Sequence, residues 1–148
     1  MSDKLSSDPL AIALFGEITA VDQMARTKFS RALPDGMELS HFSVLNHFAG
    51  VGGEKTPAQL ARIFHVTKGA MTNTLSKLET AGYINIRPDW DDGRRKFVSI
   101  SEAGKKARDE AVRAIAPVFD DVVESLGPEK IRAILPVLRE LRVFIGQA

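Results

Sequence analysis

The segment from Thr56 to Ile100 constrains the fold more than any other part of the chain, because its hydrophobic period changes from helical to strand-like. Thr56-Pro57-Ala58-Gln59 is a capping box with proline in the first turn, and Thr67 can cap a second helix. Gly82 then supplies a residue that commonly ends helices. The apolar row of the second helix consists of Met71, Leu75 and Leu78. These signals predict two short helices joined by a tight turn.

A hairpin pattern follows directly. Apolar and polar residues alternate over residues 84–87 and again over residues 98–100, as in strands with one buried face. Asp91-Asp92-Gly93 supplies turn residues between the two runs. The order helix, turn, helix, hairpin predicts a winged helix-turn-helix, in which the hairpin is the wing.

Helical patterns also lie on both sides of this segment. Start signals are Asp8-Pro9, Ser40 and Ser101, and stop signals are Pro34-Asp35-Gly36, the run Gly50-Val51-Gly52-Gly53, and Gly127-Pro128, after which a last helical pattern follows. Pro117 and Pro136 lie inside the last two helical patterns, where we expect kinks. We therefore expect a mainly α protein with a small β-hairpin, folded as one protomer over residues 1–148.

Composition excludes several classes of protein. A chain of 148 residues with 44% hydrophobic side chains can bury one substantial core but not two large ones. No window holds the roughly 18 apolar residues of a membrane helix, so we expect a cytoplasmic protein without membrane contact. The absence of cysteine excludes disulfides and thiolate chemistry. Without a phosphate-binding glycine loop, a nucleophile elbow or a carboxylate pair, we expect no enzyme and no cofactor.

The polar face of the helix after Thr67 is the candidate surface for reading DNA. It carries short hydrogen-bonding side chains and lysines, which suit base edges and the sugar-phosphate backbone. An ordinary amphipathic surface helix is the alternative interpretation. The assigned residues are Lys68 and Lys77 at phosphates, Thr72, Asn73 and Ser76 at bases, and Gly69 where the helix N-terminus approaches a phosphate.

The predicted wing adds a second candidate contact. Arg94, Arg95 and Lys96 fall on or just after the turn, so one arginine can point along the wing into a narrow minor groove. Asp92 can hold the Arg94 guanidinium through a charge-assisted hydrogen bond. We assign Asp92, Arg94 and Arg95 to DNA binding, with a merely solvated hairpin as the alternative. Trp90 either packs under the ribbon or contacts sugar edges.

Four motifs occur together in this chain: Leu60-Ala61, Leu78-Glu79-Thr80-Ala81-Gly82-Tyr83-Ile84, Asp89-Trp90-Asp91-Asp92-Gly93-Arg94-Arg95 and Val98-Ser99-Ile100-Ser101-Glu102-Ala103-Gly104. In this combination the chain resembles the MarR family of transcriptional regulators. The resemblance implies a homodimer that places the fourth helix in the major groove and the wing in the minor groove of a pseudo-palindromic operator. It also implies a repressor released by a small lipophilic or aromatic ligand. Asp92 and Arg94 match the family's wing pair, whereas Gly69 and Asn73 stand where other members often have larger or basic groups.

Dimerisation also has a reason in the residues. One recognition helix buries too little surface for high specificity, whereas two can meet half-sites about 34–36 Å apart. We expect residues 38–100 to form the DNA-binding part, and residues 9–33 and 102–146 to form dimerisation helices. The expected interface residues, each with intramolecular core as the alternative, are Leu10, Leu14, Ile18, Ile131, Leu135, Leu138 and Ile145.

Other signals are weaker. The spacing of His41 and His47 does not place both on one metal ion, and His65 lies apart, so we expect no metal site. Five phenylalanines are candidates either for an effector pocket or for simple core: Phe15, Phe29, Phe42, Phe48 and Phe119. A winged helix that binds protein rather than DNA is the alternative function.

Overall fold

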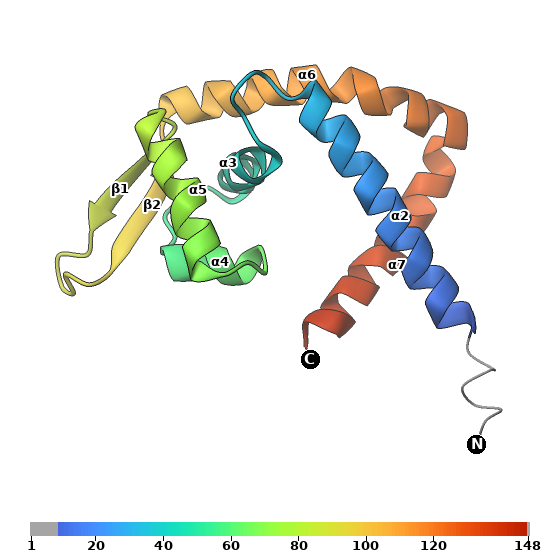
Figure 1. The fold of residues 1–148 in the computed structure, drawn as a ribbon, viewed down its shortest axis with the longest axis horizontal. Coiled ribbons are helices and arrows are strands. Elements are labelled where there is room, and N and C mark those ends of the chain that lie inside the picture. Colours follow the sequence, from blue (N-terminus) through green and yellow to red (C-terminus); the bar gives the residue numbers. More distant parts are fainter. Residues whose placement is uncertain (1–8, 148) are drawn as a thin grey trace.

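The computed structural model describes residues 9–147 and consists mainly of helices with one antiparallel hairpin (Figure 1). This confirms the predicted fold class. The predicted cap Asp8 lies outside the described residues. The elements are α2 (Pro9–Ala32), α3 (Leu39–Val51), α4 (Pro57–Ile63), α5 (Lys68–Thr80), β1 (Ile84–Pro88), β2 (Lys96–Ile100), α6 (Glu102–Leu126) and α7 (Pro128–Gly146).

The long helix α6 connects two parts of the molecule. Figure 1 shows α3, α4, α5 and the hairpin gathered near the N-terminal half of α6, while α2 and α7 extend away from its other half. The wing is therefore far along the molecule from the two terminal helices. None of the described helices is long and apolar enough to cross a bilayer.

A single apolar core holds the winged part together. Its largest fully buried side chains are Val44, Leu45, Phe48, Leu60 and Val98. They come from α3, α4 and β2, and Met71, Leu75 and Leu78 of α5 belong to the same core. The core therefore joins both helices of the turn to the wing. Ala107 of α6 belongs to the same core, which means that the start of α6 is structurally part of the winged unit.

A short strand pairing fixes the base of the wing. The backbone N–H of Lys55 donates to the carbonyl of Val98 at 3.0 Å, and the Val98 N–H donates back to Lys55 at 2.8 Å. The hairpin itself is paired from Ile84 opposite Ile100 to Pro88 opposite Lys96. The wing is thus tied to the segment immediately before α4.

The predicted N-terminal caps are confirmed at three helices and wrong at one. Thr56, Thr67 and Ser101 each accept a backbone N–H from the residue three positions later. After α5, Gly82 has the predicted left-handed conformation, with a φ of 78°. Helix α3, however, is capped by Glu38 and not by Ser40. The reason is that the Glu38 N–H donates to Nδ1 of His41 at 3.0 Å, a partner that the Ser40 position does not have.

A smaller apolar cluster joins α2 to α6. Leu33, Ala111 and Ile115 form its buried centre. The rings of Phe29 and Phe119 pack against it with centroids 4.6 Å apart. Helices α6 and α7 continue through Pro117 and Pro136, and the expected kinks there stay a prediction.

Candidate nucleic-acid interface

Helix α5 buries one face and presents the other to solvent. Met71, Leu75 and Leu78 are buried, as predicted, and Thr74 is buried beside them. The turn before α5 is made at His65, whose φ of 53° is unusual for a residue with a side chain. The predicted polar residues all lie on the exposed side: Lys68, Gly69, Thr72, Asn73, Ser76 and Lys77.

The start of α5 and the wing enclose a shared hollow of about 300 Å³. Thr72 contributes a hydroxyl to its lining, and four cations surround it, with no acidic residue among the lining side chains. Clustered cations in a concave site attract anions such as phosphates. The cations are Lys68 from α5 and Arg94, Arg95 and Lys96 from the wing.

Lys96 is a member of this hollow that the sequence reasoning did not assign. It belongs to β2, where alternate residues share a face, so it lies on the same face as the buried Val98. That face looks toward the helices, which explains why Lys96 lines the hollow with Lys68. The signal was available in the strand alternation from Lys96 to Ile100.

Asp92 does not hold the Arg94 side chain as expected. Its Oδ1 accepts the backbone N–H of Arg94 at 3.1 Å, and the described residues contain no ion pair between the two side chains. Asp92 and Arg94 are two residues apart in a tight turn, so the backbone N–H of Arg94 lies nearer to the Asp92 carboxylate than the Arg94 guanidinium does. Asp92 therefore shapes the turn, and the exposed Arg94 side chain extends from it.

Arg95 is partly engaged within the wing. Its guanidinium lies 5.7 Å from the centre of the Phe97 ring and 3.9 Å from a carboxylate oxygen of Asp89. Trp90, in contrast, is 81% exposed, which excludes the interpretation that it packs under the ribbon. Among the predicted arginines, Arg94 is the one with fewer internal contacts.

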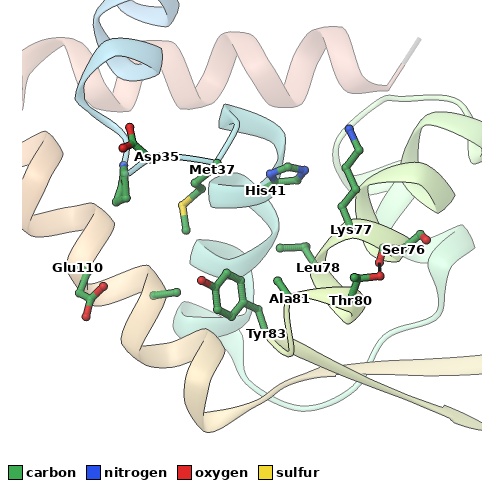
Figure 2. A pocket seen from close by; sticks show the side chains of 13 residues that line it. Asp35, Met37, His41, Ser76, Lys77, Leu78, Thr80, Ala81, Tyr83 and Glu110 are labelled. Atoms are coloured by element: carbon green, nitrogen blue, oxygen red, sulfur yellow. Dashed lines mark hydrogen bonds between the residues drawn. The ribbon is translucent and has the colours of Figure 1, made fainter.

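The other predicted α5 residues face a different side of the helix. Lys77 lies 3.9 Å from Glu38, and Asn73 lines a cavity of about 360 Å³ next to α3. Lys77 and Ser76 line a further cavity of about 390 Å³ between α3, α5 and α6, shown in Figure 2. The structure thus unites Lys68 and Thr72 with the wing but places Lys77 and Asn73 toward α3.

His41 lines the cavity of Figure 2 with an uncharged imidazole ring. Its pKa is lowered from 6.5 mainly by burial and also by Lys77, while Glu38 acts in the opposite direction. A neutral ring is also what the Glu38 N–H requires, because it donates to Nδ1. Figure 2 shows Lys77 extending from α5 on the same side as His41.

The remaining histidines have no ligand geometry. Burial lowers the pKa of His47, and its ring packs edge-on against Phe48 and Phe64. Within residues 9–147 no group of three potential ligands could hold a metal ion. Of the phenylalanines considered for a pocket, Phe48 belongs to the core of the winged part.

The predicted interface residues carry an unusual amount of exposed apolar surface. Helices α2 and α7 bury no residue at all within one chain. Ile18 and Ile131 are half-buried, and exposure of the others runs from 39% to 79%: Leu10, Leu14, Leu135, Leu138 and Ile145. Exposed apolar residues that the sequence reasoning did not assign include Ile12, Met24, Val137 and Phe144.

Comparison with known proteins places these features in a family. The family model described as "MarR family" matches residues 35–95, which span the winged part. A helix-turn-helix (HTH)-type transcriptional regulator of Mycobacterium leprae is 33% identical over 95 residues. That match spans 64% of this chain and 66% of the relative's own length. The chain belongs to the MarR family.

Solved structures of MarR proteins share the fold over nearly the whole chain. A mutant of Escherichia coli MarR complexed with operator DNA superposes with a TM-score of 0.76 at 20% identity, covering 88% of this chain and 94% of that one. Bordetella bronchiseptica BpsR, whose DNA binding is regulated by 6-hydroxynicotinic acid, superposes with a TM-score of 0.77 at 17% identity. This match covers 88% of this chain and 98% of BpsR. The MarR family consists of transcriptional regulators rather than enzymes, in agreement with the prediction.

Proposed function

We propose that this MarR protein is a dimeric, sequence-specific DNA-binding transcriptional regulator that acts in the cytoplasm. The observation that carries the proposal is the hollow where Lys68 and Thr72 of α5 meet Arg94 and Lys96 of the wing. A helix face with short polar groups beside a cationic hairpin suits a major groove and the phosphates next to it. Residues 38–100 are the proposed DNA-binding part.

The dimer is proposed on the exposed apolar faces of α2 and α7. Large exposed apolar patches on a single chain are typical of interfaces between subunits. Helix α7 and the N-terminal part of α2 extend away from the wing, so pairing through them leaves both wings free to reach DNA (Figure 1). A dimer also supplies two recognition helices for a pseudo-palindromic operator. Residues 9–33 and the later part of 102–146 are the proposed dimerisation helices.

Repression relieved by a small lipophilic or aromatic ligand is the proposed mode of regulation. BpsR provides a precedent through its described regulation by 6-hydroxynicotinic acid. In this chain the cavity in Figure 2 lies directly behind α5, with Met37, His41 and Tyr83 in its lining. A ligand bound there would press on the inner side of the recognition helix, and this shift would change its fit to DNA.

The wing assignment is tested with Arg94→Ala and Lys105→Ala. Arg94 extends from the wing turn, so its loss should weaken binding of a duplex at least about tenfold. Lys105 lies on α6 and pairs with Glu102 at 3.1 Å, so its loss should change affinity by less than about twofold. Fluorescence anisotropy of a labelled duplex measures both constants, and equal losses in the two variants would rule out the wing contact.

A further inference from the structure

The wing has two faces with different contents. Ile84, Ile86 and Val98 form the inner face, which packs on the core. The outer face points away from the core and consists of Arg87 and Asp89 on one arm of the hairpin and Arg95 and Phe97 on the other. Arg87 lies directly opposite Phe97 in the strand pairing. Arg87 is therefore not placed like Lys96, which lies on the inner face, whereas Arg95 beside the turn still lines the cationic hollow.

Arg87 makes a two-point ion pair with Glu54. Its Nε donates to one carboxylate oxygen at 2.7 Å and its Nη2 to the other at 2.9 Å. Bidentate pairs of this kind fix direction as well as distance. The hydrogen bond from Arg87 lowers the pKa of Glu54, and the same contact raises the pKa of Arg87. Both side chains therefore stay charged at neutral pH.

The pair is extended by stacking on Phe97. The Arg87 guanidinium lies 4.7 Å from the centre of the ring, and Arg95 lies over the same ring at 5.7 Å. Asp89, whose side chain is only 15% exposed, lies 3.9 Å from Arg95. The outer face is thus one connected chain of contacts from the segment before α4 to the wing turn.

Glu54 also lies next to the backbone pairing that fixes the base of the wing. Lys55, its neighbour, makes both backbone hydrogen bonds with Val98. Besides the core contacts of its inner face, the wing is therefore held by backbone pairing along one edge and by the Glu54–Arg87 pair across its outer face. The side-chain pair adds a restraint on hinge motion that backbone pairing along one edge does not supply.

We propose that Glu54 and Arg87 are positioning residues that set the direction of the wing relative to α5, and that Arg87 does not itself bind DNA. This inference rests on the proposed DNA-binding function. Arg87 is absent from the lining of the cationic hollow, and its charge is satisfied by Glu54. With the angle fixed, Arg94 and Lys96 meet DNA without first losing the freedom of a mobile hairpin.

The test uses Glu54→Gln, because the sign of its effect separates the two roles of Arg87. If Glu54 positions the wing, Glu54→Gln weakens duplex binding about two- to fivefold, the scale of one exposed ion pair. If Arg87 is a DNA contact, or if the pair is only solvated, removing a negative charge strengthens binding or leaves it unchanged. Glu102→Gln, which removes the Lys105 partner on α6, is the matched control and should leave affinity unaltered.

A second measurement follows the wing directly through Trp90, the sole tryptophan of the chain. Time-resolved anisotropy of its fluorescence reports how freely the wing turn moves. In the full-length protein without DNA, Glu54→Gln and Phe97→Leu should both increase the fast component, and Glu102→Gln should not. If the fast component is unchanged in both wing variants, the positioning role is overturned, even if these variants still bind DNA. Wild-type protein that binds no duplex overturns the proposed function instead, while the anisotropy still decides whether the pair restrains the wing.

Discussion

Leu138→Arg is expected to leave the protein monomeric and to weaken specific DNA binding at least about a hundredfold. Leu138 lies on α7 and is 41% exposed in the single chain, among apolar neighbours that include Leu135 and Ile145. A buried arginine without a partner has a large desolvation cost, so it prevents this face from pairing. A monomer meets only one half-site and loses the gain from simultaneous contact at the second.

Analytical ultracentrifugation measures the oligomeric state, and anisotropy of a labelled duplex measures the affinity. Glu140→Arg is the matched control, because it adds the same side chain two residues away at an exposed polar position of α7. It should remain dimeric. A dimeric Leu138→Arg variant with normal affinity would contradict the proposed interface.

Gly104→Ala is expected to lower the free energy of unfolding by about 1–3 kcal/mol, the usual cost of overfilling a packed site. A Cβ at Gly104 would overlap the backbone carbonyl of Tyr83 and lie 2.8 Å from Cγ1 of Ile100. The Tyr83 carbonyl cannot retreat freely, because it accepts the Ser101 N–H at 3.0 Å. This clash exceeds the better helix propensity of alanine, which contributes up to about 1 kcal/mol.

Thermal unfolding followed by circular dichroism measures the effect, expected to be on the order of a 5 °C fall in Tm. Gly69→Ala is the control, since a Cβ there meets no atom within 4 Å on helix α5. It should leave Tm unchanged or raise it. A Gly104→Ala protein as stable as the wild type would show that α6 and the end of the wing are not packed as described.

Local signals in the sequence were sufficient for most of the fold. The caps at Thr56, Thr67 and Ser101 depend on residues three positions apart, and the strands depend on alternation with a period of two. Each of these patterns lies within a few residues, so it can be read without knowing the tertiary structure. The start of α3 was misplaced because Ser40 is the commoner type of cap, and the His41 partner of Glu38 is less usual.

The candidate site was only partly predictable, because several side chains are directed by distant partners. Lys77 pairs with Glu38, which is 39 positions earlier in the sequence, and Arg87 pairs with Glu54, which is 33 positions earlier. No periodicity encodes such pairs. The engagement of Arg95 with Asp89 follows from the pairing register of the hairpin, which places both on the outer face. The position of Lys96, however, follows from strand alternation alone, because it shares a face with Val98.

We propose that the hollow between α5 and the wing binds DNA in a sequence-specific way, once in each subunit of a dimer. The decisive experiment is selection from a random duplex library at low salt, followed by a salt titration of the enriched duplex. We expect a palindrome with half-sites about one turn apart, and an affinity that falls steeply with salt as counterions are released. A library that yields no palindrome, or binding that is insensitive to salt, would contradict it and favour a wing that docks onto protein.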